Sequence, residues 1–262
     1  MNSHEPDLGP KEFWNQLAFS DRAVLLLDYD GTLAPFTPDR DRAYPWPGVR
    51  ELLAETLRLD KGRTIFISGR EAKAVARLLD LEERPEIWGV HGRERLFPDG
   101  SLLRPKLDPR VAEALERAAA VAADAGLAHC LEKKFGALAL HWRGRPEAER
   151  SRLEALARTT LAELAARGGL ELRPFDGGIE LRSPTVTKGD AVKTVLAESR
   201  TDTVVAFMGD DHTDEDGFEA LRGRGLGILV AAEPRPTAAT LRLVPPAGIL
   251  AFLRRWNDCL GG

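Results

Sequence analysis

The sequence predicts an α/β fold, in which a parallel β-sheet core is interrupted by a smaller inserted α+β segment. Three observations support this prediction. Short, continuous apolar runs each end in polar residues, helix-like patterns alternate with these runs, and the order of elements changes in the middle of the chain. The length, 262 residues, leaves open both one large domain and a core with an insert.

Composition excludes several classes of protein. With 43% hydrophobic and 30% charged residues, the chain is typical of an ordinary globular protein. No apolar run approaches the roughly 20 residues of a membrane span, and residues 1–15 lack the apolar stretch of a signal peptide. A net charge of −4 argues against a nucleic-acid partner, and two cysteines exclude a disulfide scaffold or a cysteine zinc site. We therefore expect a cytoplasmic protein with no membrane partner.

The core is predicted from three apolar runs, which fit strands buried on both faces: Ala23–Asp28, Arg63–Ser68 and Thr203–Met208. Helical patterns follow them, roughly over residues 48–59, 71–79 and 214–222. Strands that alternate with helices indicate βαβ units and a parallel sheet. Ligands of such sheets bind beyond the carboxyl ends of the strands, where all three runs carry polar residues.

The middle of the chain follows another order. Helical patterns over Pro109–Gly126 and Pro146–Arg167 are each followed by two strand-like segments, the second pair around the turn Asp176-Gly177-Gly178. This α-β-β-α-β-β order is not that of a βαβ unit. We therefore predict a core formed by residues 1–103 and 183–262, with a separate module at 104–182.

The first candidate site is Asp28-x-Asp30-Gly31-Thr32, at the end of the first apolar run. Glycine allows the chain to turn there, so that both carboxylates can converge on one site. One aspartate can then attack phosphorus, and the other can protonate the leaving oxygen and later activate water. The alternative is an ordinary strand-to-loop turn with capping aspartates.

Two further candidates suit a phosphate group. Ser68-Gly69-Arg70 ends the second apolar run and offers a hydroxyl and backbone N–H groups, although Ser68 could also be a simple helix cap. Lys188 precedes a helix-like stretch and could balance the charge of a nucleophilic carboxylate and a phosphoryl group. The chain has 8 lysines against 29 arginines, which draws attention to Lys188 without excluding a surface role.

The acidic run Gly209–Asp216 is the sharpest signal, with five carboxylates within seven residues after the third apolar run. Like charges packed this closely repel each other unless a cation lies among them. Carboxylate oxygens are the ligands that Mg²⁺ prefers. The alternative is an acidic, solvated loop.

Taken together, these motifs resemble those of the haloacid dehalogenase superfamily of phosphotransferases, with Asp28–Thr32, Ser68, Lys188 and Gly209–Asp214 as its four motifs. The resemblance implies a Rossmann-like, doubly wound core with an inserted cap at 104–182. It implies Asp28 as nucleophile and Asp30 as general acid/base, with Ser68 and Lys188 as further catalytic groups. It also implies a phosphate site and a Mg²⁺ site: Gly31, Thr32, Ser68, Gly69 and Lys188 for phosphate, and Asp28, Asp30, Asp210, Asp211 and Asp214 for the metal.

Within that superfamily, several strings resemble trehalose-6-phosphate phosphatases: Gly89-Val90-His91-Gly92, Glu132-Lys133-Lys134, His141-Trp142-Arg143 and Glu180-Leu181-Arg182. The resemblance implies Mg²⁺-dependent hydrolysis of trehalose 6-phosphate through an aspartyl-phosphate, the last step of trehalose biosynthesis. It implies a substrate-binding set of Arg70, His91, Glu132, Lys134, Glu180 and Arg182. From the residues alone, charged side chains on predicted hairpins suit sugar hydroxyls or form a solvated face, and His141 is expected to be a packed histidine.

Two other functions stay open at this point. One is a related phosphatase that acts on another sugar phosphate or a glycosyl-glycerate phosphate. The other is a catalytically silent protein that binds a sugar phosphate in a regulatory role. In every case we expect a small-molecule sugar phosphate as partner and take a monomer as the working assumption.

Overall fold

The computed structural model describes residues 6–175, 177–183 and 186–261, and the chain divides into two compact units. Unit 1 comprises Met1–Phe36, Asp41–Leu102 and Thr187–Gly262, and unit 2 comprises Thr37–Arg40 and Leu103–Val186. The short segment Thr37–Arg40 was not expected in the smaller unit. Asp176, in the predicted hairpin turn, lies outside the described residues.

Unit 1 is built on a sheet that has eight strands within the described residues, in the order β12-β11-β10-β1-β2-β3-β4-β5. The strands from β12 to β3 pair in parallel, and β4 pairs with β3 in antiparallel fashion. Their bounds are β1 Ala23–Leu27, β2 Gly62–Ile67, β3 Glu86–Gly89, β4 Glu94–Leu96, β5 Leu102–Leu103, β10 Val204–Gly209, β11 Leu226–Val230 and β12 Leu241–Leu243. The predicted α/β class with a parallel core sheet is confirmed.

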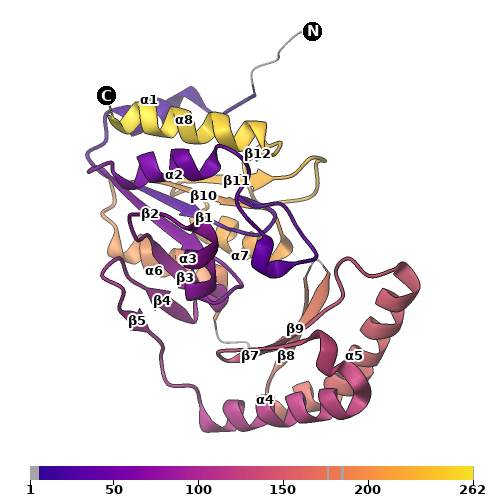
Figure 1. The fold of residues 1–262 in the computed structure, drawn as a ribbon. Coiled ribbons are helices and arrows are strands. Elements are labelled where there is room, and N and C mark those ends of the chain that lie inside the picture. Colours follow the sequence, from indigo (N-terminus) through magenta and orange to yellow (C-terminus); the bar gives the residue numbers. More distant parts are fainter. Residues whose placement is uncertain (1–5, 176, 184–185, 262) are drawn as a thin grey trace. The chain divides into compact units, whose positions relative to one another are not determined.

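Helices cover both faces of this sheet (Figure 1). Their bounds are α1 Lys11–Ala18, α2 Val49–Leu57, α3 Ala72–Leu79, α6 Lys188–Glu198, α7 His212–Leu221 and α8 Ala247–Gly261. Helices α1, α2, α3 and α8 contribute to one hydrophobic cluster, and α6 and α7 contribute to another on the opposite face. None of the helices within the described ranges is long and apolar enough to cross a lipid bilayer.

The central strand β1 explains why the first motif is held firmly. Its side chains alternate between the two clusters, with Leu25 and Leu27 in the first and Val24 and Leu26 in the second. All four are buried, which is typical of a strand covered on both faces. Asp28, the residue that follows β1, is therefore held in place by a rigid strand.

Unit 2 contains a four-stranded antiparallel sheet in the order β6-β7-β9-β8. The strands are β6 Leu131–Lys134, β7 Ala137–His141, β8 Glu171–Phe175 and β9 Gly178–Arg182, and the long helices are α4 Pro109–Ala122 and α5 Glu147–Gly168. Leucines and alanines of both helices pack with β7 and β9 in one hydrophobic cluster. The element order α-β-β-α-β-β is the one that the sequence predicted.

The structure differs from the predicted elements at two places that bear on the site. Lys188 does not precede a helix but begins α6, where Thr187 caps the helix and Asp190 completes a capping box. The alternating pattern over His129–Lys134 predicts a strand, but β6 starts at Leu131, because Ala123–Leu127 and Ala128–Cys130 form short helical turns after α4.

Candidate active site

Three of the predicted site residues follow directly on neighbouring strands of the unit 1 sheet. Asp28 follows β1, Ser68 follows β2 and Asp210 follows β10. The parallel ladder extends past the strand ends, because Asp28 donates its N–H to the carbonyl of Met208 at 2.8 Å. The carboxyl edge of the sheet thus brings together residues that are up to 182 positions apart in sequence.

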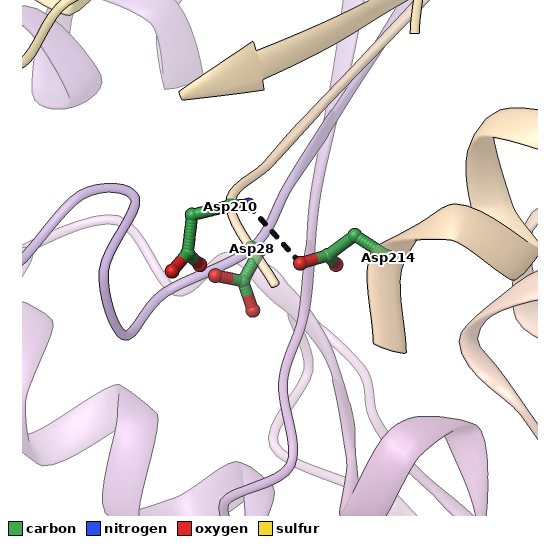
Figure 2. Close-up of side chains that lie close together, drawn as sticks. All are labelled: Asp28, Asp210 and Asp214. Carbon is green, nitrogen blue, oxygen red and sulfur yellow. Dashed lines mark hydrogen bonds between the residues drawn. The ribbon is translucent and has the colours of Figure 1, made fainter. Parts of the chain in front are cut away.

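Three carboxylates converge at this edge. Asp28, Asp210 and Asp214 each place a carboxylate oxygen within 4.8 Å of the others. Figure 2 shows the carboxylates of Asp28 and Asp210 beside each other, with Asp214 reaching toward them from α7. Asp28 and Asp214 are buried, so their mutual repulsion is poorly screened by water.

Lys188 supplies a positive charge to this cluster. Its Nζ donates to Asp28 Oδ1 and to Asp214 Oδ1, at 2.6 Å in both cases. The lysine side chain is only 3% exposed, so both bonds form in a dry environment where charge-assisted contacts are strong. The predicted pairing of Lys188 with the Asp28 carboxylate is present.

The acidic cluster holds more negative charge than Lys188 can balance. Burial raises the pKa of Asp28 to about 7, against the lowering effect of Lys188 and with a further rise from Asp214. Burial and the charges of Asp28 and Asp214 raise the pKa of Asp210 well above its ordinary value. Burial alone would lower the pKa of Lys188, but the Asp214 and Asp28 carboxylates raise it, so the lysine stays charged.

These carboxylates fit a hard divalent cation. Asp28 Oδ2 is buried and has no hydrogen-bond partner among the described residues. An unpartnered buried carboxylate oxygen is costly, and a cation would satisfy it and offset the excess negative charge. Asp28 and Asp210 are therefore the candidate ligands that this structure favours.

Asp211 and Asp214 have other partners. Asp214 Oδ1 binds Lys188, and its Oδ2 accepts the N–H groups of Asp210 and Asp211 at 3.1 and 3.0 Å. Asp211 caps α7 and accepts the N–H of His212 at 2.6 Å. Asp214 therefore shapes the loop that carries Asp210, and Asp211 lies outside the three-carboxylate cluster.

Asp30 is held by an arginine that the sequence had suggested for substrate binding. Arg70 Nε donates to Asp30 Oδ2 at 2.6 Å and Arg70 Nη2 to Asp30 Oδ1 at 2.7 Å. This bidentate geometry fixes the plane of the carboxylate. Arg70 is buried and also lies over the ring of Tyr29, 5.9 Å from its centroid.

Gly31 and Thr32 contact the metal-binding candidate Asp210. Thr32 Oγ1 donates to Asp210 Oδ1 at 3.2 Å. The Gly31 N–H donates to the carbonyl of Ala34 at 2.7 Å, so this amide closes the turn. Both residues therefore shape the turn and the acidic site. Their role in phosphate binding, which the resemblance implies, stays a prediction.

Replacing Gly31 with alanine should disrupt this site. Gly31 has φ +83°, and an added Cβ would overlap the carboxylate of Asp210 and the ring of Phe36. We expect Gly31→Ala to lower the phosphatase activity that the sequence predicts by on the order of 100-fold, because the carboxylate must move. Steady-state assays would measure the loss. The matched control is Gly223→Ala, which also has positive φ (+73°) but no atom within 4 Å of the added Cβ.

His91 lies against the Ser68-Gly69-Arg70 turn. Its N–H donates to the carbonyl of Ser68 at 2.8 Å, and a Cβ on Gly69 would lie 2.7 Å from its ring. Val90 and His91 both have positive φ, 50° and 57°, which is strained for a β-branched residue such as valine. This strained turn positions the His91 ring against Gly69, the residue after the predicted phosphate-binding serine.

Unit 2 has a charged cluster of its own. Lys134 Nζ donates to Glu180 Oε1 at 2.8 Å and lies 3.8 Å from Glu132 Oε2. Lys134 and Glu180 are almost fully buried, with side-chain exposures of 7% and 3%. Arg182, on the same strand as Glu180, is also buried. The structure thus brings Glu132, Lys134 and Glu180 together.

Two members of the unit 2 cluster were not predicted as site residues. Arg40 forms an ion pair with Glu132 at 2.6 Å, and His141 donates to the same carboxylate at 2.8 Å. In the hairpin, Glu132 on β6 lies opposite Ala139 on β7, and His141 lies two residues further along β7 on the same face. The alternation of side chains along the two strands could therefore have suggested this contact. Arg40 is distant in sequence, and no local pattern reveals its position.

The chain is similar to known proteins along most of its length. A family model described as trehalose-phosphatase matches residues 26–246. "Probable trehalose-phosphate phosphatase C" of Arabidopsis thaliana is 32% identical, and the match covers 88% of this chain and 76% of that protein.

Solved structures show a similar fold. The C-terminal domain of the C. albicans trehalose-6-phosphate phosphatase has a TM-score of 0.77 at 21% identity, covering 98% of this chain and 99% of that one. A haloacid dehalogenase-like hydrolase from Bacteroides thetaiotaomicron has a TM-score of 0.65 at 16% identity, covering 89% and 99%. These likenesses confirm the predicted fold class.

Proposed function

The chain belongs to the trehalose-phosphatase family, and from this premise we propose that it hydrolyses trehalose 6-phosphate to trehalose and phosphate. The family confirms the predicted enzyme class, a phosphatase. The observation that carries the proposal is the buried set at the ends of β1 and β10, in which Lys188 binds Asp28 beside Asp210 and Asp214. This set has the composition that phosphoryl transfer requires: a nucleophile, a fixed cation and acidic metal ligands.

The first step forms a covalent intermediate on the protein. An oxygen of Asp28 attacks phosphorus, and the bond between phosphorus and the sugar oxygen breaks. The electron pair stays on the sugar oxygen, which takes a proton from Asp30. Both Asp30 oxygens accept a hydrogen bond from Arg70, and each oxygen has a second lone pair that can carry the transferred proton.

The second step releases phosphate. Asp30 accepts a proton from a water molecule, which attacks phosphorus and breaks its bond to Asp28. Lys188 keeps its contact with Asp28 and Asp214 throughout, and its charge stabilises the negative transition state. Ser68 offers its hydroxyl to a phosphate oxygen from the end of β2.

We propose that the acidic cluster holds Mg²⁺, with Asp28 and Asp210 as side-chain ligands and the Asp30 carbonyl as a backbone ligand. The raised pKa values of Asp28 and Asp210 and the unpartnered Asp28 Oδ2 support this assignment. When bound, the ion would neutralise phosphate oxygens and so ease attack by a carboxylate.

We propose that Glu132, Lys134 and Glu180 bind the sugar, in a substrate-specificity unit corresponding to the predicted insert. The half-buried Glu132 carboxylate and the buried Glu180 carboxylate can accept hydrogen bonds from sugar hydroxyls, and the Lys134 ammonium group can donate to them. Phosphate chemistry is thus proposed for residues of unit 1, and hydroxyl recognition is proposed for residues of unit 2.

A substrate panel tests this function. We expect phosphate release from trehalose 6-phosphate to exceed that from glucose 6-phosphate and other sugar phosphates by about 100-fold in kcat/KM. We also expect the activity to vanish with EDTA and to return with Mg²⁺. Preference for another sugar phosphate would replace the proposed substrate, and binding without phosphate release would indicate a regulatory protein.

A further inference from the structure

Arg40 and His141 both contact Glu132, and neither belongs to the sugar-binding set proposed above. We propose that they are positioning residues, which hold one oxygen of the Glu132 carboxylate so that the other oxygen accepts a sugar hydroxyl. This inference rests on the proposed function, because it assigns a geometry to one of the residues that would bind the sugar.

All the cationic and donor groups around Glu132 lie on one of its oxygens. Arg40 Nη1 lies 2.6 Å, His141 Nε2 2.8 Å and Lys134 Nζ 3.8 Å from Oε2. No described residue donates a hydrogen bond to Oε1. The Glu132 side chain is 27% exposed, so Oε1 can meet a ligand. The carboxylate is thus fixed at one end and available at the other.

The contact distances define the proton on His141. A ring nitrogen 2.8 Å from a carboxylate oxygen has to carry the hydrogen, because two lone pairs would otherwise face each other. Nε2 therefore donates to Glu132, and its 3.2 Å approach to Arg40 Nη1 is a packing contact. The ring of Phe175 lies edge-on at 5.2 Å and holds the imidazole in this orientation.

The surrounding donors and charges favour an ionised Glu132, and burial is the main factor that favours a neutral His141. Although burial opposes ionisation, His141, Lys134 and Arg40 lower the pKa of Glu132 to about 2. Burial lowers the pKa of His141, which Arg40 and Lys134 lower further against the raising effect of Glu132. His141 thus supplies a hydrogen-bond donor without adding another positive charge.

The orientation of a carboxylate matters for a hydroxyl because a hydrogen bond weakens steeply when its angle departs from linearity. Without Arg40 or His141, the Glu132 side chain can rotate toward Lys134, which already binds Glu180. The hydroxyl would then lose a charged acceptor. We expect a loss of about 10-fold or more in kcat/KM for each truncation, carried mainly by a rise in KM.

The test compares two substrates in one set of variants. Arg40→Ala and His141→Ala are assayed with trehalose 6-phosphate and with p-nitrophenyl phosphate, which has no sugar. We expect the ratio of the two kcat/KM values to fall about 10-fold, and His141→Gln, whose amide can donate to Glu132, to restore most of it. The matched control is Lys133→Ala, which removes an exposed ion pair with Glu116 from the same hairpin.

Two results would overturn the inference. The ratio could stay at the wild-type value, either with both activities unchanged or with both lowered equally by a loss of stability, or His141→Gln could behave like His141→Ala. Failure of the proposed function is distinct, because the wild-type protein would then release no phosphate from trehalose 6-phosphate. In that event the ratio is measured with the sugar phosphate that the wild-type protein prefers, and an unchanged ratio again overturns the inference.

Discussion

Replacing Asp28 with asparagine is expected to lower phosphate release by on the order of 10⁴-fold or more while the fold stays intact. The amide has the shape of the carboxylate but cannot attack phosphorus, so no covalent intermediate forms. Single-turnover assays with trehalose 6-phosphate would measure the loss. The control is Asp216→Asn, an exposed aspartate of the same acidic run. Substantial activity in pure Asp28→Asn protein would exclude Asp28 as nucleophile.

The same substitution should not destabilise the protein. Because burial raises the pKa of Asp28 to about 7, the folded state binds more protons than the unfolded state between about pH 4 and 7. The stability contribution of this group therefore falls as the pH rises through that range. In EDTA above pH 7, Asp28→Asn should have a Tm equal to or above that of the wild-type protein, as thermal unfolding would show. A clear drop in Tm would mean that the Lys188–Asp28 contact outweighs the repulsion among the carboxylates.

Truncating Lys188 should have the opposite effect on stability. In Lys188→Met the buried Asp28 and Asp214 lose the cation that bonds to both, and a broken buried pair costs about 3–5 kcal/mol in the free energy of unfolding. Activity should also fall by on the order of 10³-fold, because the transition state loses a fixed charge. Urea unfolding and steady-state assays measure the two losses.

The chain offers a matched control and a rescue for this experiment. Lys193→Met removes a lysine of the same helix whose side chain is 67% exposed, so it should change neither quantity appreciably. In the double variant Lys188→Met/Asp214→Asn, one of the unpaired carboxylates is neutralised. We expect it to recover part of the stability but no activity. A Lys188→Met protein as stable as the Lys193→Met control would contradict the prediction.

The sequence predicted that the side chains of Asp28 and Asp210 meet at the carboxyl edge of the sheet, because its signals are local. An apolar run buried on both faces predicts a central strand, and Asp28 and Asp210 stand directly after such runs. Parallel strands place their carboxyl ends at one edge, so the convergence of these carboxylates follows from strand order. The α-β-β-α-β-β order of unit 2 was predicted for a similar reason, because segments with the hydrophobic period of a helix alternate there with pairs of segments that have the period of a strand.

What the sequence could not predict depends on contacts between distant segments. The two hydrogen bonds from Arg70 to Asp30 join loops that are 40 positions apart in sequence. The sequence of neither loop indicates which residue of the other loop it contacts. The different contacts of Asp211 and Asp214 follow from where α7 begins, because Asp211 is the N-cap residue and Asp214 is the third helical residue. A shift of one residue at that helix start would remove both aspartates from these two capping positions.

The segment Thr37–Arg40 affects how unit 2 could be transferred between this protein and a related one. Because it packs with unit 2 although its neighbours in sequence belong to unit 1, the chain passes between the units four times. A graft of residues 103–186 onto another phosphatase would leave behind Arg40 and its bond to Glu132. Transfer of unit 2 from this chain to a relative would therefore require two separate stretches of sequence to move together, which a simple exchange of one continuous segment cannot achieve.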